Sequence, residues 1–138
     1  MVLAALNTAR DKGADAAVKS SLSTIRTQAE LYYDNNANQY ATAVSTNGAA
    51  CVGNIGMFTD PTILAAIRGI MNNDGANDPD CDVSTTAWAV SVSLKGGGFM
   101  CADSTGYASV NSRTAVVYTA VNGAAGVGAK TGNGIVCN

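Results

Sequence analysis

The apolar positions at the start of the chain recur at the spacing of a helix. They follow one another in steps of three and four, with one longer gap, at Leu3, Leu6, Ala14, Val18, Leu22, Ile25, Ala29 and Tyr32. Charged side chains occupy many of the positions between them, and no proline interrupts the run. This pattern predicts one amphipathic helix over residues 2–33, ending at Asp34-Asn35-Asn36 and on the order of 48 Å long.

The predicted helix has no capping residue before its first turn. Residues 1–6 are its most apolar part, and a helix start usually carries Ser, Thr, Asp or Asn. We therefore expect that a longer apolar helix precedes residue 3; a helix that frays at a true N-terminus is the alternative. The apolar run present here is shorter than the ~20 residues that cross a bilayer, and it lacks the basic start of a signal peptide.

A second, shorter helix is predicted after residue 60. Asp60 is a good N-cap and Pro61 fits the first helical position. Ile63, Ile67, Ile70 and Met71 form one apolar face, and residues 72–75 end the helix. We expect this helix to cover one flank of the core.

The hydrophobic period changes from helical to two after Thr85. Trp88, Val90, Val92 and Leu94 alternate with small residues, which predicts a strand with one buried face. Residues 95–98 contain three glycines and predict a turn, from which residues 99–102 return as the second strand of a hairpin.

Further strands are predicted toward the end of the chain. Residues 107–110 and 115–121 are strand-like, whereas residues 122–134 are rich in glycine and predict a loose loop. Together these elements predict a single α+β domain of two parts: residues 1–34 form a long helix, and residues 35–138 form a head. The second half of the helix, residues 18–33, is expected to cover an antiparallel sheet of three to four strands.

The charge of the chain gives little support to nucleic acid as a partner. The net charge is −2 and charged residues make up 13% of the chain, so a basic surface of the kind that binds phosphates is not expected. Four of the eight basic residues lie in the first 26 positions, while the middle of the chain is acidic. Opposite poles of this kind suit contacts between the helix of one copy and the head of another; an ordinary solvated surface is the alternative.

Four cysteines predict disulfides and an exported protein. Cys51, Cys81, Cys101 and Cys137 are widely spaced, there is no C-x-x-C motif, and the chain has no histidine, which argues against zinc. Three pairings are possible. We favour 51–81 with 101–137, because each closes a loop of roughly thirty to forty residues; free buried thiols are a further alternative.

Catalytic motifs are not apparent, and the protein is not expected to be an enzyme or to need a cofactor. Without histidine there is no Ser-His-Asp or Cys-His arrangement. Residues 103–106, Asp-Ser-Thr-Gly, differ from the Asp-Thr/Ser-Gly loop of aspartic proteases by one extra residue and are predicted to form a plain turn. Residues 96–98 join two strands, which excludes a phosphate-binding loop.

The acidic stretch of residues 72–82 is the one candidate for a metal. Asp78, Asp80 and Asp82 alternate with other residues and offer carboxylates to calcium. The stretch lacks the central glycine and the final glutamate of an EF-hand loop, so we favour no metal here and expect a solvated loop.

Several segments of the chain resemble those of bacterial type IV pilins. The resemblance is strongest over residues 2–34 and 81–107, in the segments 4–12, 16–19, 28–34 and 101–106. The order of a long N-terminal helix, a connecting loop, a hairpin-rich sheet and a C-terminal loop held by a cysteine is also that of the pilins and the related pseudopilins. No single motif is diagnostic, but their combination is fairly specific.

The resemblance implies a structural subunit of a type IV pilus, on the cell surface, which serves adhesion, motility or DNA uptake. In that family an apolar first half of the helix, with a glutamate near its start, anchors the subunit in the inner or cytoplasmic membrane before assembly. This sequence lacks both, which implies an N-terminally truncated, soluble and monomeric form whose Met1 is an expression start.

The partners implied are other copies of the chain and the pilus assembly machinery, with Leu3, Leu6 and Ala14 packing between subunits. The alternative is a pseudopilin of a type II secretion or competence machine. The acidic, cysteine-free C-terminus of secretion pseudopilins is missing here, which weighs against that alternative. An adhesive or DNA-binding minor pilin is a third possibility, which a basic patch would favour.

Overall fold

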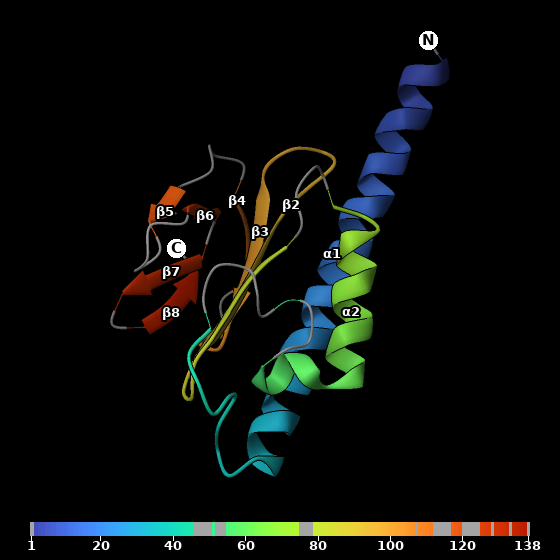
Figure 1. Ribbon diagram of the computed structural model, residues 1–138. Helices are drawn as coiled ribbons and strands as arrows, with labels where there is room; N and C mark the ends of the chain where they lie inside the picture. The colour runs from blue at the N-terminus through green and yellow to red at the C-terminus, as the bar shows by residue number, and fades with distance from the viewer. Residues whose placement is uncertain are drawn as a thin grey trace.

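A long helix runs the length of the molecule and projects beyond it in the computed structural model (Figure 1). The structure describes residues 2–45, 51, 55–74, 79–106, 108–111, 117–119, 125–127, 129–132 and 134–137, with side chains up to residue 106 and at Cys137. Helix α1 spans Val2–Asn35, two residues longer than predicted. Its N-terminal end stands clear of the rest of the protein, while its second half lies against the body.

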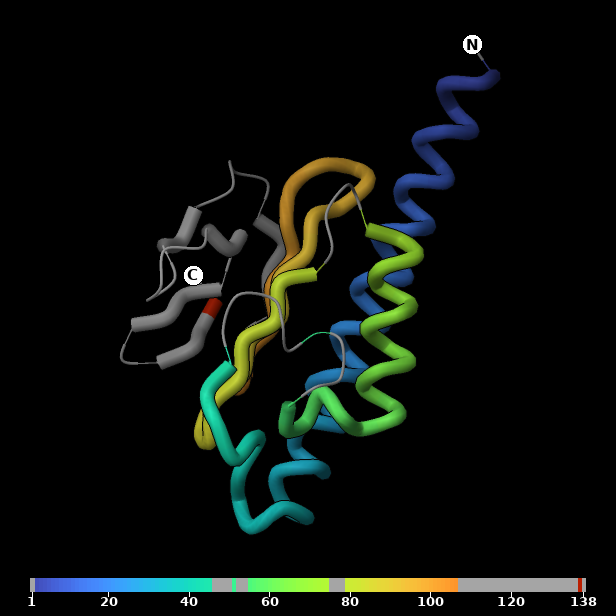
Figure 2. The backbone as a smooth tube through the Cα atoms, in the orientation of Figure 1, coloured from blue at the N-terminus to red at the C-terminus, as the bar shows by residue number. Residues whose placement is uncertain are grey.

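The chain then turns back along the body and enters two further helical segments (Figure 2). A 3₁₀ turn, η2, spans Gly56–Thr59, and helix α2 spans Pro61–Met71. The predicted N-cap is confirmed, because the Asp60 carboxylate accepts hydrogen bonds from the backbone N–H groups of Thr62 and Ile63 at 2.8 and 3.1 Å. Helix α2 packs alongside α1.

Four strands form the main sheet, and every pair of neighbours is antiparallel. They are ordered as they follow along the chain: β1 (Asp80–Val83), β2 (Trp88–Ser93), β3 (Phe99–Asp103) and β4 (Ala108–Asn111). The α+β architecture predicted from the sequence, a long helix packed on an antiparallel sheet of three to four strands, is confirmed.

The core lies between the two helices and one face of the sheet. Helix α1 contributes Val18, Leu22, Ile25 and Ala29, helix α2 contributes isoleucines, and the sheet contributes Trp88, Val90 and Val92. The full burial of a side chain of this size stabilises the fold by about 1.5–3 kcal/mol. The apolar faces predicted for residues 18–33, for α2 and for β2 therefore meet in one core, except that Met71, at the end of α2, is exposed.

Strand β1 was not predicted. We expected a solvated acidic loop in residues 72–82, but its last three residues belong to a strand that pairs with β2, with Cys81 opposite Val90. Two aspartates in the four residues of β1 are unfavourable for a strand. The pairing with β2 and the disulfide at Cys81 override that local preference.

Strand β2 is covered on both faces, which corrects the prediction of one buried face. Ala89 and Ser91, the small residues of the alternation, are as deeply buried as the apolar residues between them. Ala89 packs with Cys101 and Cys137 in a second, smaller cluster. Small residues are suited to this face because a disulfide, and the chain around it, lies close against it.

The glycine-rich tail contains strands where we predicted a loose loop. Strand β5 (Val117–Thr119) pairs with β6 (Ala125–Val127), and β7 (Ala129–Gly132) pairs with β8 (Gly134–Cys137). Low strand propensity in glycine-rich sequence is again outweighed by pairing.

Candidate functional site

The first part of α1 presents an apolar surface. Val2, Leu3 and Leu6 are 74%, 78% and 55% exposed, whereas Val18 and Leu22, further along the same helix, are buried. Ala14 is half-buried and lies where the exposure changes. Of the predicted packing residues, Leu3 and Leu6 are therefore accessible and Ala14 only partly so. No helix among the described residues is both long and apolar enough to cross a membrane.

The tip of the β2–β3 hairpin meets α1 near this change. The Asp15 carboxylate accepts a hydrogen bond from the Gly96 backbone N–H, with its two oxygens 3.3 and 3.2 Å from the nitrogen. A side chain on Gly96 would collide with this carboxylate. The attachment was missed in the sequence because it joins residues that are 81 positions apart.

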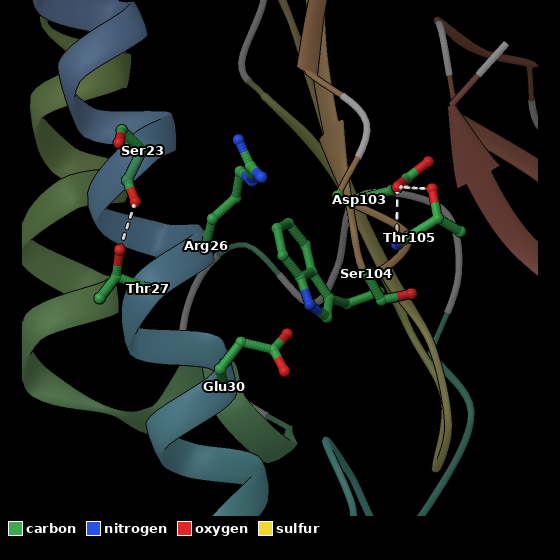
Figure 3. Close-up of a pocket in the computed structure, with 9 residues that line it drawn as sticks. Ser23, Arg26, Thr27, Glu30, Asp103, Ser104 and Thr105 are labelled. Carbon is green, nitrogen blue, oxygen red and sulfur yellow. Dashed lines mark hydrogen bonds between the residues drawn. The ribbon is translucent and has the colours of Figure 1, made fainter.

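A polar pocket of about 470 Å³ lies between α1 and the turn that follows β3 (Figure 3). Helix α1 supplies Ser23, Arg26, Thr27 and Glu30 to its wall, and the sheet side supplies Trp88 and residues 103–106. The Arg26 guanidinium reaches toward the turn: its Nη2 atom lies 3.8 Å from the position that a Cβ on Gly106 would occupy. The pocket thus combines one cation, two carboxylates (Glu30 and Asp103) and hydroxyl groups.

A buried tyrosine is hydrogen-bonded to Glu30, one of the residues that line this pocket. The Tyr40 hydroxyl donates a 2.9 Å hydrogen bond to Glu30 Oε1, and the Tyr40 ring stacks at a tilt on Tyr33, with ring centroids 4.6 Å apart. Burial, and then the hydrogen bond to the Glu30 carboxylate, raise the pKa of Tyr40 well above its usual value. Tyr40 therefore stays protonated and fixes one oxygen of Glu30.

Asp103 fastens the end of the chain to the sheet. Its side chain is buried, and one carboxylate oxygen accepts hydrogen bonds from the Thr105 backbone N–H at 2.8 Å and the Thr105 hydroxyl at 2.6 Å. The other oxygen accepts from the Cys137 backbone N–H at 2.7 Å. The turn predicted at residues 103–106 is present, and its aspartate has a structural role that the sequence alone did not reveal.

The two disulfides belong to different apolar clusters, one in the main core and one on the other face of the sheet. Cys51 is bonded to Cys81, with Cα atoms 5.1 Å apart, and Cys101 to Cys137, with Cα atoms 5.8 Å apart. These are the two pairs that the loop lengths favoured. Cys137 is thus held twice, by a covalent bond to β3 and by the carboxylate two residues further along that strand.

The three aspartates considered for calcium are in different situations. Asp78 lies outside the described residues. Asp80 and Asp82 lie two positions apart in β1; Asp82 is buried, and burial raises the pKa of the half-buried Asp80. In the described part of the chain, no three or more side chains of His, Cys, Asp or Glu gather as metal ligands would.

Comparisons with known proteins do not place the chain in a family. No protein-family model matches it. No curated protein and no solved structure matches it either. The chemistry and the geometry of the described residues therefore carry the functional argument.

The sequence indicated part of this site and missed the rest. Helical periodicity found the exposed Leu3 and Leu6, and cysteine spacing favoured the observed pairs. The pocket was missed because it forms between α1 and a turn almost eighty residues away. Lys12, Lys19 and Arg26 are spaced seven residues apart. This spacing was a signal in the sequence that could have indicated the side of α1 on which the pocket lies.

Proposed function

We propose that the protein is a structural subunit of a type IV pilus filament on the cell surface. The observation that carries the proposal is the division of α1 into two parts. Its first part exposes Leu3 and Leu6, whereas its second part buries Val18, Leu22 and Ile25 against the head. A helix that is half committed to its own core and half exposed as an apolar rod is suited to packing against other copies.

The rest of the molecule supports the same function. The sheet and helix α2 form a compact head at one end of the rod, and two disulfides are typical of proteins that work outside the cytoplasm. In the proposed filament the apolar parts of α1 pack together inside and the heads form the outer surface. Adhesion, motility and DNA uptake are all compatible with such a fibre.

Fibre assembly by variants of α1 tests this function. Leu6→Asp places a charge in the exposed apolar surface, and we expect cells that carry this variant to lose their fibres. Leu31→Asp is the matched control. Leu31 is also an exposed leucine of α1, at 49%, but it lies in the second half of the helix, which packs against the head. We expect that control to keep its fibres.

The melting temperature separates assembly from folding. Because Leu6 is exposed, the Leu6→Asp protein is expected to melt within a few degrees of the unmodified protein. Unchanged fibre yield with Leu6→Asp would contradict the proposal. If an antibody to the protein labels only the cell envelope and the parent strain forms no fibres, the protein would instead be a pseudopilin.

A further inference from the structure

Three cations of α1 lie on one line along the helix. Lys12, Lys19 and Arg26 are spaced seven residues apart, and seven residues return to nearly the same direction, since the helix turns by 100° per residue. The line covers about 21 Å. Lys12 and Lys19 are exposed and Arg26 is half-buried in the pocket wall. We call these three residues the basic stripe.

The cations of the basic stripe are not neutralised within the described part of the molecule. None of them forms an ion pair with a described residue. The carboxylates of α1 one turn away in sequence accept hydrogen bonds from uncharged groups: Asp15 accepts from the Gly96 backbone N–H, and Glu30 accepts from the Tyr40 hydroxyl. Lys12 and Lys19 are therefore available for ion pairs with a second molecule, while Arg26 lies in the wall of a pocket that also holds the Glu30 and Asp103 carboxylates.

The head carries charge of the opposite sign. Between Arg68 and Lys95 the chain has no basic residue but four aspartates, at positions 74, 78, 80 and 82. Asp82 is buried, whereas Asp74 and Asp80 are half-buried. Asp74 forms a bridge with Leu94, and Asp80 lies opposite Ser91, so both flank β2 on its β1 side. We call this side the acidic edge.

The basic stripe and the acidic edge of one molecule lie on different sides of it. Arg26 faces the turn after β3, whereas the acidic edge is at β1, at the other side of β2. A contact between the stripe of one copy and the edge of another therefore uses two different surfaces. Contacts of this heterologous kind do not close on themselves as a two-fold dimer does, and they can continue into an open filament.

We infer that the basic stripe Lys12–Lys19–Arg26 docks on the acidic edge of the head of a second copy, with the exposed Lys12 and Lys19 making the main contact. The inference rests on the proposed filament function and names the polar contact that sets the register between neighbouring subunits. Exposed charges of this kind act mainly on the rate and specificity of association and weaken with salt.

Self-association of the 138-residue protein in solution tests the inference. Concentration-dependent NMR shifts at about 20 mM NaCl, where screening is weak, are expected at the stripe and at the acidic edge, and they are expected to fade at about 0.5 M NaCl. The association through the stripe is expected to be too weak for a stable oligomer at low concentration, because each exposed ion pair contributes only about 0–1 kcal/mol.

Charge reversal gives the decisive comparison. Lys19→Glu is expected to weaken self-association at least fivefold, roughly the effect of one exposed ion pair and the repulsion that replaces it. Arg10→Glu changes the net charge by the same amount on the same helix, but Arg10 points about 160° away from Lys12. We expect this control to stay within about twofold of the unmodified protein.

A complementary variant excludes a merely structural effect. Mixing Lys19→Glu with Asp80→Lys presents two opposite charges again, and it is expected to restore the association that is weakened in each variant alone. Equal losses in Lys19→Glu and Arg10→Glu, or no self-association at low salt, would overturn the inference. So would salt-sensitive binding of a fluorescent DNA duplex that Lys19→Glu abolishes, because the stripe would then be a nucleic-acid surface.

The test separates this inference from the proposed function. Fibres that assemble normally from Lys19→Glu subunits would refute the stripe contact and leave the filament function in place. If the protein associates through the stripe in solution but forms no fibre on cells, the stripe contact would stand and the filament function would be refuted.

Discussion

At the scale of single residues, Asp103 is the side chain that attaches Cys137, near the end of the chain, to the main sheet. It is buried, and its two oxygens bind separate parts of the structure, the turn at Thr105 and the backbone of Cys137. A buried N–H that loses its acceptor costs about 1–3 kcal/mol. Sequence patterns gave no sign of this, because Asp103 lies in a segment that is also a plausible solvated turn.

Asp103→Asn is therefore expected to lower the free energy of unfolding by about 1–3 kcal/mol, because an amide cannot supply both carboxylate acceptors. Urea unfolding measures the change. Asp34→Asn, at an exposed position near the end of α1, is the control and is expected to change it by less than about 0.5 kcal/mol. Equal values for the two variants would contradict the role assigned to Asp103.

The raised pKa of Tyr40 leads us to expect that the folded protein loses stability in alkaline solution. Its pKa is raised in the folded protein by burial and by Glu30, so above about pH 10, the usual pKa of tyrosine, the unfolded chain loses the proton more readily than the folded one. The free energy of unfolding is therefore expected to fall as the pH rises past this value. Urea unfolding at about pH 9 and pH 11 measures this fall. Tyr40→Phe should make the fall shallower, and an unchanged slope would contradict the account.

At the scale of elements, two glycines with opposite surroundings test how the helices are placed. Gly13, in the middle of α1, has no atom within 4 Å of an added Cβ. Gly56, at the start of η2, has φ of +55°, and an added Cβ would collide with the Tyr40 carbonyl and with Ala41. The first position needs no glycine, whereas the second needs one both for its backbone angle and for its close contact.

Gly13→Ala is accordingly expected to stabilise the protein by up to about 1 kcal/mol, the difference in helix propensity. Gly56→Ala is expected to destabilise it by about 2 kcal/mol or more, because strain and overlap add. Thermal unfolding of both variants gives the comparison. Two shifts of the same sign would show that one of these environments is wrongly described.

Helices and strands were predictable from the sequence where one buried face produces a regular spacing of apolar residues. Periodicity located α1, α2 and the β2–β3 hairpin, and Asp60-Pro61 located the start of α2. Periodicity failed where pairing between strands overrides the intrinsic preference of the residues. The aspartates of β1 and the glycines of β6 and β7 are poor strand formers. Periodicity also could not show that the small residues of β2 are buried, because a disulfide that packs against them involves Cys137, far along the chain.

At the scale of the whole molecule, the disulfide between Cys101 and Cys137 holds the last part of the chain against the sheet. Replacing both cysteines by serine is expected to speed trypsin cleavage after Arg113 and Lys130 under native conditions, and to cost about 2–4 kcal/mol of stability. Mass spectrometry identifies the cleavage sites. Replacing Cys51 and Cys81 by serine is the control.

We expect that control to leave the rate of cleavage after Arg113 and Lys130 nearly unchanged, because the disulfide between Cys51 and Cys81 ties β1 to the segment before it. Equal acceleration in both double variants would mean that cleavage follows overall unfolding, and the local attachment at Cys137 would then have no special role.

The central claim, that this chain is a filament subunit, is tested most directly by immunogold electron microscopy of the producing cells. The antibody is raised against the 138-residue protein, and cells in which its gene is deleted serve as the control. We predict gold particles along the whole length of extended surface fibres that the deletion removes. Gold confined to the cell envelope, with fibres absent or unlabelled, would contradict the claim.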